Sequence, residues 1–499
     1  MRVRAWQRCG VALAATFVAA GCATIDRVNT TASGGQSASG ATAVAVSGSG
    51  RYVAFQSAAT DLFSFDWNGQ QHVYRKDRAT GTIVDVDRNA SGLIATAATL
   101  GAISDDGNLV AFITATSLVP ADTNGLRDVY VRNVSAGTTV LGSVLPDGSI
   151  LPPAATNGGV LSVAFDAGGH LFFDAGSGSS SVPGSFGFLR DLGAGTTTLV
   201  LNQGFHERVY VSRDGHHLAY NFNCGTPRVC QHNAGFVDLT APYPHAPTLC
   251  DGAAVAGISN DGRYVLVDRA PGSFTCSNPA IPGRYDRMTG TWLDLGVPTP
   301  GASTMHAAGL SGDGRFVLLV GDDAALSGGT SGHQGGFVLD TVTGWSSRVT
   351  ADTVDAAANA SASATDRYEI SADGRTVAFT SVATNLVPGD TNGRADAFAR
   401  ATPRPRVADC APSAVFQGTN HVKIAIDGAE FLAGARATVS GTGVTVNSAT
   451  PSADGRTLTL DVSVATDAEP FTSRDVTVRN VGGFGFADGF RPHCLEVLT

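Results

Sequence analysis

Two seven-residue segments carry oxygen side chains at the spacing of a metal-binding loop. They are Asp122-Thr-Asn-Gly-Leu-Arg-Asp128 and Asp390-Thr-Asn-Gly-Arg-Ala-Asp396. In each segment, carboxylate or amide oxygens stand at the first, third and seventh positions around a glycine, as at the start of a calcium loop. The candidate calcium ligands are therefore Asp122, Asn124, Asp128, Asp390, Asn392 and Asp396.

The same two segments have a second interpretation that needs no metal. An Asn-Gly pair reverses the chain in an Asx turn, and no glutamate completes the calcium-ligand set here. Both interpretations stay open, and calcium is the only cofactor that the sequence suggests.

Catalytic motifs are missing from the chain. We find no H-E-x-x-H zinc helix, no G-x-x-x-x-G-K-[ST] phosphate loop and no G-x-S-x-G nucleophile elbow. The 11 histidines are scattered, and only His216 and His217 are adjacent. Neighbours on a strand point to opposite faces, so these two are not expected to share a metal. The sequence therefore predicts a protein that is not an enzyme.

A short unit recurs seven times and predicts the elements that carry these residues. Two clear copies are Ile103-Ser-Asp-Asp-Gly-Asn-Leu-Val-Ala-Phe112 and Ile370-Ser-Ala-Asp-Gly-Arg-Thr-Val-Ala-Phe379. Asp-Gly between two apolar runs predicts a hairpin, and two more strand-like runs follow in most units. Four antiparallel strands in each unit are typical of a β-propeller blade. The shared glycines are Gly50, Gly107, Gly168, Gly215, Gly262, Gly314 and Gly374.

The Ser-x-Asp-Gly-Arg-x-Val-Ala-Phe unit resembles the WD-like propeller repeat of TolB-type periplasmic proteins. The segment from Asn385 to Phe398 resembles a bacterial subfamily of that repeat, and the resemblance covers roughly residues 25–405. The expected fold class is all-β, with a seven-bladed β-propeller over residues 25–407. We expect Arg27-Val-Asn-Thr30 to complete the last blade, because it precedes the first unit as Arg348-Val-Thr-Ala351 precedes the seventh. The alternative closing strand is Arg404–Asp409.

The repeat stops after Pro403-Arg-Pro405, and residues 408–499 form a separate domain in this interpretation. Short alternating apolar runs predict a β-sandwich. The segments that begin at Phe431 and at Arg474 resemble IPT/TIG-type immunoglobulin-like domains.

The first 21 residues are predicted to be a signal peptide. Arg2, Arg4 and Arg8 precede a short apolar stretch and a small-residue ending, which is the pattern of secretory signals. The ending at Cys22 resembles a bacterial lipobox, so residues 22–24 are predicted to be a lipid-anchored N-terminus. Ala23 after the cysteine implies the outer membrane, on its periplasmic side or at the cell surface. Cleavage by an ordinary signal peptidase, with Cys22 coincidental, is the alternative.

Cysteine usage agrees with export, because six cysteines remain after Cys9 and Cys22 are set aside. We expect Cys410 to pair with Cys494 across the last domain, and the other four to pair locally. Those four are Cys224, Cys230, Cys250 and Cys276.

The formal net charge of −10 argues against a nucleic-acid partner, which needs a clustered basic surface. The sequence thus predicts a monomeric, non-catalytic envelope lipoprotein whose propeller binds a protein or a glycan, attached to the membrane through its N-terminal lipid. The alternative is a propeller hydrolase or lyase that acts on polysaccharide or peptide with acidic residues in the central channel.

Overall fold

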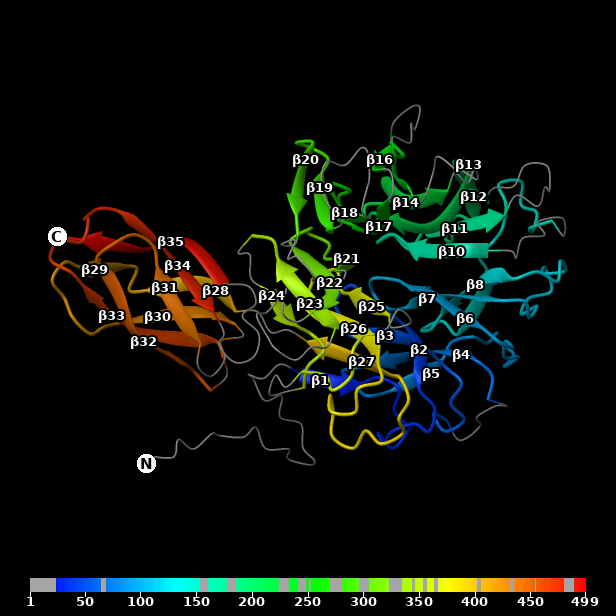
Figure 1. Ribbon diagram of the computed structural model, residues 1–499, viewed down its shortest axis with the longest axis horizontal. Helices are drawn as coiled ribbons and strands as arrows, with labels where there is room; N and C mark the ends of the chain where they lie inside the picture. Colours follow the sequence, from blue (N-terminus) through cyan, green and yellow to red (C-terminus); the bar gives the residue numbers. More distant parts are fainter. Residues whose placement is uncertain are drawn as a thin grey trace. The chain divides into compact units, whose positions relative to one another are not determined.

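The chain is all-β, as predicted, and the computed structural model shows strands and no helix in the part of the chain that it describes (Figure 1). No described segment is a helix long and apolar enough to span a membrane. The chain divides into two compact units, and their described residues lie within 24–401 and 405–499. The described residues are 24–63, 69–152, 160–176, 185–223, 233–240, 248–250, 253–269, 281–295, 305–322, 334–342, 346–352, 357–362, 367–401, 405–429, 431, 435–453, 455–479 and 489–499.

The described strands of the first unit form seven four-stranded antiparallel groups, which make it a β-propeller. The first two groups are β2–β5 (Ala41–Val46, Tyr52–Ser57, His72–Asp77, Ile83–Asp85) and β6–β9 (Thr99–Ile103, Leu109–Thr114, Asp128–Asn133, Thr138–Leu141). The third and fourth share the long strand β13 and comprise β10–β16 (Val160–Phe165, Leu171–Gly176, Ser185–Asp191, Thr196–Val211, His217–Asn223, Asn233–Asp238, Thr248–Cys250).

The remaining three groups follow in chain order around the unit (Figure 1). The fifth and sixth are β17–β20 (Ala253–Ile258, Tyr264–Arg269, Gly283–Asp286, Thr291–Asp294) and β21–β24 (His306–Leu310, Phe316–Asp322, Gln334–Asp340, Ser346–Arg348). The seventh combines β25–β27 (Tyr368–Ile370, Thr376–Ser381, Asp396–Ala401) with β1 (Thr24–Arg27).

The Ser-x-Asp-Gly turn joins the first two strands of a sheet through a fixed set of hydrogen bonds. In the second sheet, Ser104 Oγ donates to Asp106 Oδ1 (2.6 Å) and accepts the Leu109 amide (2.9 Å). Gly107 follows with a φ of 72°, a left-handed conformation that favours glycine.

The third sheet shifts this turn by one residue. The glycine with positive φ is Gly169 (79°), and not Gly168, which the repeated unit predicts. The reason is that Asp166 takes the position of the serine and its Oδ1 accepts the His170 amide at 2.8 Å.

Backbone hydrogen bonds between neighbouring turns tie the sheets into a ring. The bonded residues follow the serine, or its replacement Asp166, by one or two positions. Among the described residues these bonds link six of the seven neighbouring pairs of sheets. They are Gly48 N to Asp105 O, Ala167 N to Arg213 O, Asp214 N to Asn260 O, Asn260 N to Gly312 O, Gly312 N to Ala372 O and Asp373 N to Gly48 O.

The N-terminal segment supplies the fourth strand of the last sheet. Strand β1 pairs antiparallel with β27, from Thr24 opposite Ala401 to Arg27 opposite Phe398. The alternative segment does not close the ring, because β28 (Arg406–Ala411) pairs with β30 (Val422–Ala429) in the second unit.

Arg27 anchors this closing strand electrostatically. Its guanidinium lies 3.2 Å from Asp390 Oδ2 and 3.1 Å from Asp396 Oδ2, and all three side chains are buried. Asn29 Nδ2 also donates to Asp396 Oδ1 (2.7 Å), and Gln36 Nε2 donates to Asp390 Oδ1 (2.8 Å). The last sheet and the N-terminal segment therefore share one buried polar network.

The second unit consists of two four-stranded sheets around one core. Their order is β28–β30–β33–β32 and β29–β35–β34–β31. Apolar side chains of both sheets, such as Ile424, Leu460 and Val476, form a single buried cluster, so the unit is a β-sandwich. Cys410 and Cys494 form a disulfide in this core, with their Cα atoms 5.5 Å apart. Its further strands are β33 (Thr457–Val464), β32 (Val444–Pro451), β29 (Ala414–Phe416), β35 (Gly489–Leu498), β34 (Ser473–Arg479) and β31 (Arg436–Val439). An immunoglobulin-like topology stays a prediction.

Replacing Arg27→Met tests the role of the closing strand. The change leaves two buried carboxylates without their cation, so we expect a loss of about 3–5 kcal/mol in the free energy of unfolding. Urea unfolding of the mature chain, followed by tryptophan fluorescence, measures it. Arg51→Met is the matched control, because the Arg51 side chain is 49% exposed in its pair with Asp77. We expect the control to lose less than about 1 kcal/mol. Equal losses would contradict the anchoring role of Arg27.

Candidate functional site

The first strands of all seven sheets surround one central cavity. Its volume is about 750 Å³, and its lining includes residues of β2, β6, β10, β13, β17, β21 and β25. Cavities of this size commonly hold small ligands or part of a larger one. We call this cavity the central channel.

Glycines allow the first strands to approach one another around the channel. These strands carry a one-residue irregularity in their pairing with the second strand, for example between Leu100 and Ala102 and between Val255 and Gly257. A Cβ on Gly257 would lie 2.9 Å from Leu310 Cβ in the next sheet. A side chain at this position would push the neighbouring strands apart, so the glycine is needed for close packing.

The channel wall is mostly small or aliphatic. Examples are Ala43, Ala102, Ala164, Ala256 and Ala308, one from each of five sheets. Hydroxyl and amide side chains also line it, together with Tyr210 and Arg367. These polar residues include Thr42, Gln56, Thr99, Ser162 and Asn260.

Charged side chains from three sheets meet at the end of the channel formed by the Ser-x-Asp-Gly turns. Arg213 of the fourth sheet forms an ion pair with Asp105 of the second. Its guanidinium also reaches the turn of the first sheet, because a Cβ on Gly48 would lie 2.9 Å from Arg213 Nη1. Burial lowers the pKa of Arg213 to about 10, and the nearby carboxylates of Glu369 and Asp373 oppose this shift. Arg213 therefore remains a cation at neutral pH.

Glu369 of the seventh sheet joins this group but has a structural partner as well. Its Oε2 accepts the Val46 amide at 2.7 Å, a donor on the first strand of the neighbouring sheet. The channel lining thus contains the two guanidinium groups of Arg213 and Arg367 and two carboxylates, and each carboxylate already contacts a donor or a cation.

The residues of the first predicted calcium loop bind other parts of the protein. The Tyr130 hydroxyl donates to Asp122, and Ser143 Oγ donates to Asp128 Oδ1 at 2.6 Å. Asn124 Oδ1 accepts the Leu126 amide at 2.8 Å, as in an Asx turn. Burial raises the pKa of Asp128 above the usual range of aspartate.

In the second loop, the carboxylates of Asp390 and Asp396 contact Arg27, and Asn392 Nδ2 donates to the Ser37 carbonyl (3.0 Å). Burial raises the pKa of Asp396 despite the nearby guanidinium. The described residues include no group of three or more His, Cys, Asp or Glu side chains placed to hold a metal ion. Calcium binding stays a prediction.

Several predicted site residues lie outside the described part of the chain. These are the signal peptide with Cys22, and Cys224, Cys230 and Cys276. Cys250 ends β16, but its side chain is not described. The local disulfides among these residues therefore stay predictions.

Sequence reasoning missed the charged end of the channel. Asp105 and Arg213 each follow the serine of the repeated turn, a position that varies from unit to unit. The position is glycine, aspartate, arginine, asparagine, glycine and alanine in units one, two, four, five, six and seven. This pattern could have predicted the ion pair, because a ring places the equivalent residues of different units close together, and here two of them carry opposite charges.

No protein-family model matches the chain, and no curated protein matches it in sequence. Solved structures with similar folds include an oligogalacturonate lyase in complex with manganese, at 14% identity and a TM-score of 0.47. That similarity covers 77% of this chain and 99% of the lyase. The β-propeller domain of the Trilobed protease from Pyrococcus furiosus is 10% identical, with a TM-score of 0.45, over 68% of this chain and 91% of that one. A TolB-type protein from Agrobacterium tumefaciens is 16% identical, with a TM-score of 0.32, over 73% of this chain and 90% of that one. At such identities and TM-scores these similarities carry no information about activity.

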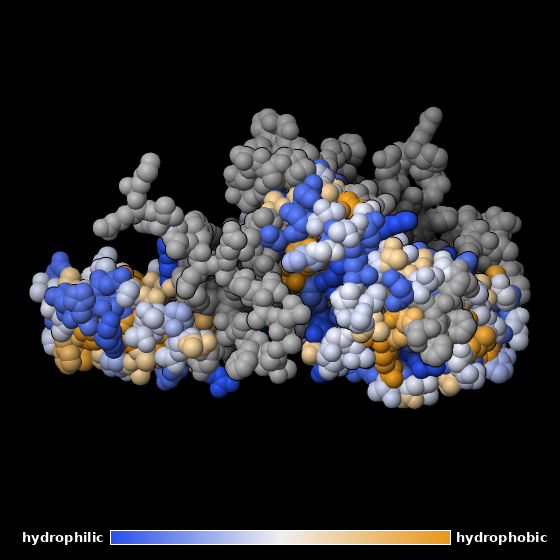
Figure 2. All heavy atoms as spheres, turned by 90° about the horizontal axis from the view of Figure 1, so that it is seen from below, coloured by the Kyte–Doolittle hydropathy of each residue, from blue (hydrophilic) through white to orange (hydrophobic). Residues whose placement is uncertain are grey.

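The surface offers no competing continuous apolar area in the view of Figure 2. There, the described hydrophobic residues form separate small patches among hydrophilic ones.

A double-mutant cycle tests the charged end of the channel. Asp105 is 35% exposed in its pair with Arg213, so solvent screens the pair and we expect Asp105→Asn to cost about 0.5 kcal/mol. We expect Arg213→Met to cost about 1–2 kcal/mol, because Glu369 and Asp373 lose the same cation. Urea unfolding of the two single variants and the double variant measures these costs and the coupling between them. Equal costs with no coupling would show that Arg213 does not hold the carboxylates together.

Proposed function

We propose that this chain is a non-catalytic binding protein of the cell envelope, and that its channel receives part of a protein or glycan ligand. The observation that carries the proposal is the chemistry of the channel wall. The wall is mainly small and aliphatic, and its two carboxylates are engaged by Arg213 and by the Val46 amide. A general acid or base must reach the proton that it transfers, and engaged carboxylates are poorly placed for this.

The polar residues of the wall favour a ligand with hydrogen-bonding groups. Thr42, Thr99 and Ser162 offer hydroxyls, and Arg367 offers a guanidinium. Hydroxyl groups of a glycan and backbone groups of a peptide both match such donors and acceptors.

A second candidate function is a hydrolase or lyase that acts on polysaccharide or peptide. The specific observation in its favour is that Asp105, Glu369 and Arg213 come together from three sheets. A ligand that displaced Arg213 would free the Asp105 carboxylate, and an accessible carboxylate can act as a general acid or base.

The proposal includes an exported chain with an acylated Cys22, anchored in the outer membrane. Its support is the sequence pattern of the first 22 residues. The closing strand begins at Thr24, so an anchor at Cys22 would lie next in the chain to the ring.

Capture experiments with the mature chain test the binding function. Proteins and glycans of the solubilised envelope are passed over the immobilised chain, with and without residues 410–499. The channel-narrowing variant Thr42→Trp is compared with Thr80→Trp, a matched control because Thr80 is exposed and does not line the channel. We expect a ligand that the wild type and Thr80→Trp retain and Thr42→Trp loses, and we expect to recover it intact. Products that disappear with Asp105→Asn and Glu369→Gln would establish the enzyme instead.

Lipidation is tested separately with the Cys22→Ser variant. We expect wild-type cells to incorporate labelled palmitate into the chain and the variant to lose the label, because the lipid is attached to this cysteine. Membrane fractionation should move the variant to the soluble fraction. An unlabelled wild-type chain would mean ordinary signal cleavage.

A further inference from the structure

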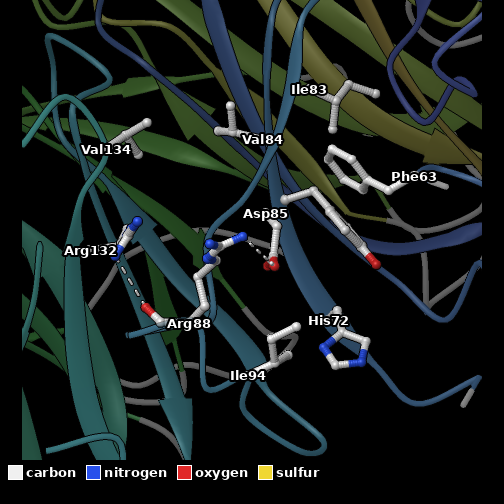
Figure 3. Close-up of a pocket in the computed structure, with 11 residues that line it drawn as sticks. Phe63, His72, Ile83, Val84, Asp85, Arg88, Ile94, Arg132 and Val134 are labelled. Carbon is white, nitrogen blue, oxygen red and sulfur yellow. Dashed lines mark hydrogen bonds and ion pairs between the residues drawn. The ribbon is translucent and has the colours of Figure 1, made fainter. Parts of the chain in front are cut away.

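A second cavity lies beside the first and second sheets, away from the residues of the central channel. Its volume is about 470 Å³, and its lining residues are drawn in Figure 3. Most of the wall is apolar, from Phe63, Tyr74, Ile83 and Val84 on one side to Ile94 and Val134 on the other. Asp85 and Arg88 lie in the middle of the lining residues, with Arg132 on one side and His72 on the other (Figure 3). We call this cavity the side pocket.

The repeat itself shows which of these residues serve the fold. Residues 85–94 begin with the last residue of the short strand β5. Their counterparts, 27–36, 141–150 and 348–357, begin in the same way at the ends of β1, β9 and β24. All four segments contain a bridge between their fourth and tenth residues. The four segments can therefore be compared position by position.

The third position has the same structural role in all four segments. It carries Asp87, Asn29, Ser143 or Thr350, and each side chain bonds to the start of the third strand of its sheet. In the first sheet, Asp87 Oδ2 lies 2.9 Å from His72 Nδ1. The His72–Asp87 pair therefore belongs to the fold.

The first position is acidic only in the side pocket, where Asp85 replaces Arg27, Leu141 or Arg348 of the other segments. The fourth position is charged only there, where Arg88 replaces Thr30, Val144 or Ala351. Asp85 stands where the second sheet has buried Leu141, and Arg88 stands where it has Val144. Asp85 is largely buried, and its nearest cation, Arg88 Nη1, is 3.8 Å away, too far for a hydrogen bond. Asp85 Oδ1 and Arg88 Nε are buried with no hydrogen-bond partner. Unsatisfied buried polar atoms are costly, so these two substitutions need a reason beyond stability.

The charge of the side pocket favours an anion. Burial, and then the neighbouring Asp87 carboxylate, raises the pKa of Asp85 to about 7. A protonated Asp85 carries no charge, so the charges of Arg88 and Arg132 together exceed that of the neighbouring Asp87 carboxylate. Arg132 is held in place, because its Nη1 donates to the Gly137 carbonyl (2.9 Å) and to Thr139 Oγ1 (3.2 Å). Burial, and then the nearby Arg88, lowers the pKa of Arg132, and a bound anion would relieve that repulsion.

We propose that the side pocket binds an organic anion, a carboxylate on an apolar body, with the carboxylate at Arg88 and Arg132 and the apolar body against Phe63, Ile83 and Val134. Guanidinium groups bind carboxylates with charge-assisted hydrogen bonds, and apolar walls of this extent bury a ligand's hydrocarbon part. This site is separate from the proposed function of the channel, so either can hold without the other.

Calorimetric titration of the full mature chain with octanoate, octylammonium and octanol at about pH 6 tests the proposal. The three probes share one apolar chain and differ in charge, and ordinary carboxylic acids are ionised at this pH. We expect octanoate to bind more tightly than octanol and octylammonium not to bind. Tighter binding of octylammonium, or binding of none of the three, would overturn the proposal.

Repeat-derived variants locate the site. Arg88→Val copies the second sheet, and we expect it and Arg132→Met to weaken octanoate binding about tenfold or more. Arg190→Met is the matched control, because Arg190 donates to Thr197 Oγ1 at 2.9 Å as Arg132 does to Thr139, but lies outside the side pocket. Octanoate affinity unchanged in Arg88→Val, or lost equally in Arg190→Met, would place the anion elsewhere.

The pH dependence of octanoate binding is a test that can be made on the wild-type chain. The groups that face Asp85 are His72 on β4, Asp87 and Arg88 on its own segment, and Arg132 on β8. Since the raised pKa means that Asp85 gains its charge as the pH passes about 7, octanoate affinity should fall between about pH 6 and 8.5. Asp85→Leu, which copies Leu141, should remove this fall. A wild-type affinity that does not change with pH would contradict the role of Asp85.

Discussion

The ring depends on the hydrogen bonds that join one Ser-x-Asp-Gly turn to the next. Each turn offers a backbone amide and a carbonyl at its tip, and the amide of Gly48 meets the carbonyl of Asp105 in the next sheet. The turn glycine contributes a second contact, since a Cβ on Gly107 would overlap the Tyr52 ring. A residue with a side chain would thus lose both the left-handed turn and the approach of the neighbouring sheet. The close spacing of these turns also sets the width of the central channel, which the first strands surround.

Closure imposes a different demand, because the last sheet must take its fourth strand from the other end of the chain. Backbone pairing of β1 with β27 spans only four residues. The Arg27 network adds side-chain bonds at this junction, where its guanidinium and the Asn29 amide meet the carboxylates of Asp390 and Asp396. A carboxylate-rich segment that resembles a calcium loop therefore has a cation of the protein itself beside it.

Much of the fold could be predicted from the sequence, because the repeat encodes local structure directly. Asp-Gly turns and the alternation of the runs predict the strands, and the repeat predicts that the N-terminal segment closes the last sheet. The closing strand is Thr24–Arg27, however, and not the predicted Arg27–Thr30. The partners of Asp390 and Asp396 could not be predicted, since Arg27 is more than 300 residues away and no local pattern connects them. The meeting of Asp105, Arg213 and Glu369 was hidden for the same reason. Only the circular arrangement makes them neighbours.

The repeat also separates residues that the fold requires from residues that it does not. Asn29, Asp87, Ser143 and Thr350 differ in chemistry, yet all satisfy the start of a third strand, so variation there is compatible with one structural role. Asp85 and Arg88, in contrast, place charges at two positions that are uncharged in the second sheet, where Leu141 is buried. A carboxyl whose pKa is raised by burial from 3.8 to about 7 destabilises the folded chain increasingly as the pH rises from the first value to the second. The second sheet avoids this cost at the same position with Leu141, and the proposed ligand of the side pocket would account for the carboxyl of Asp85.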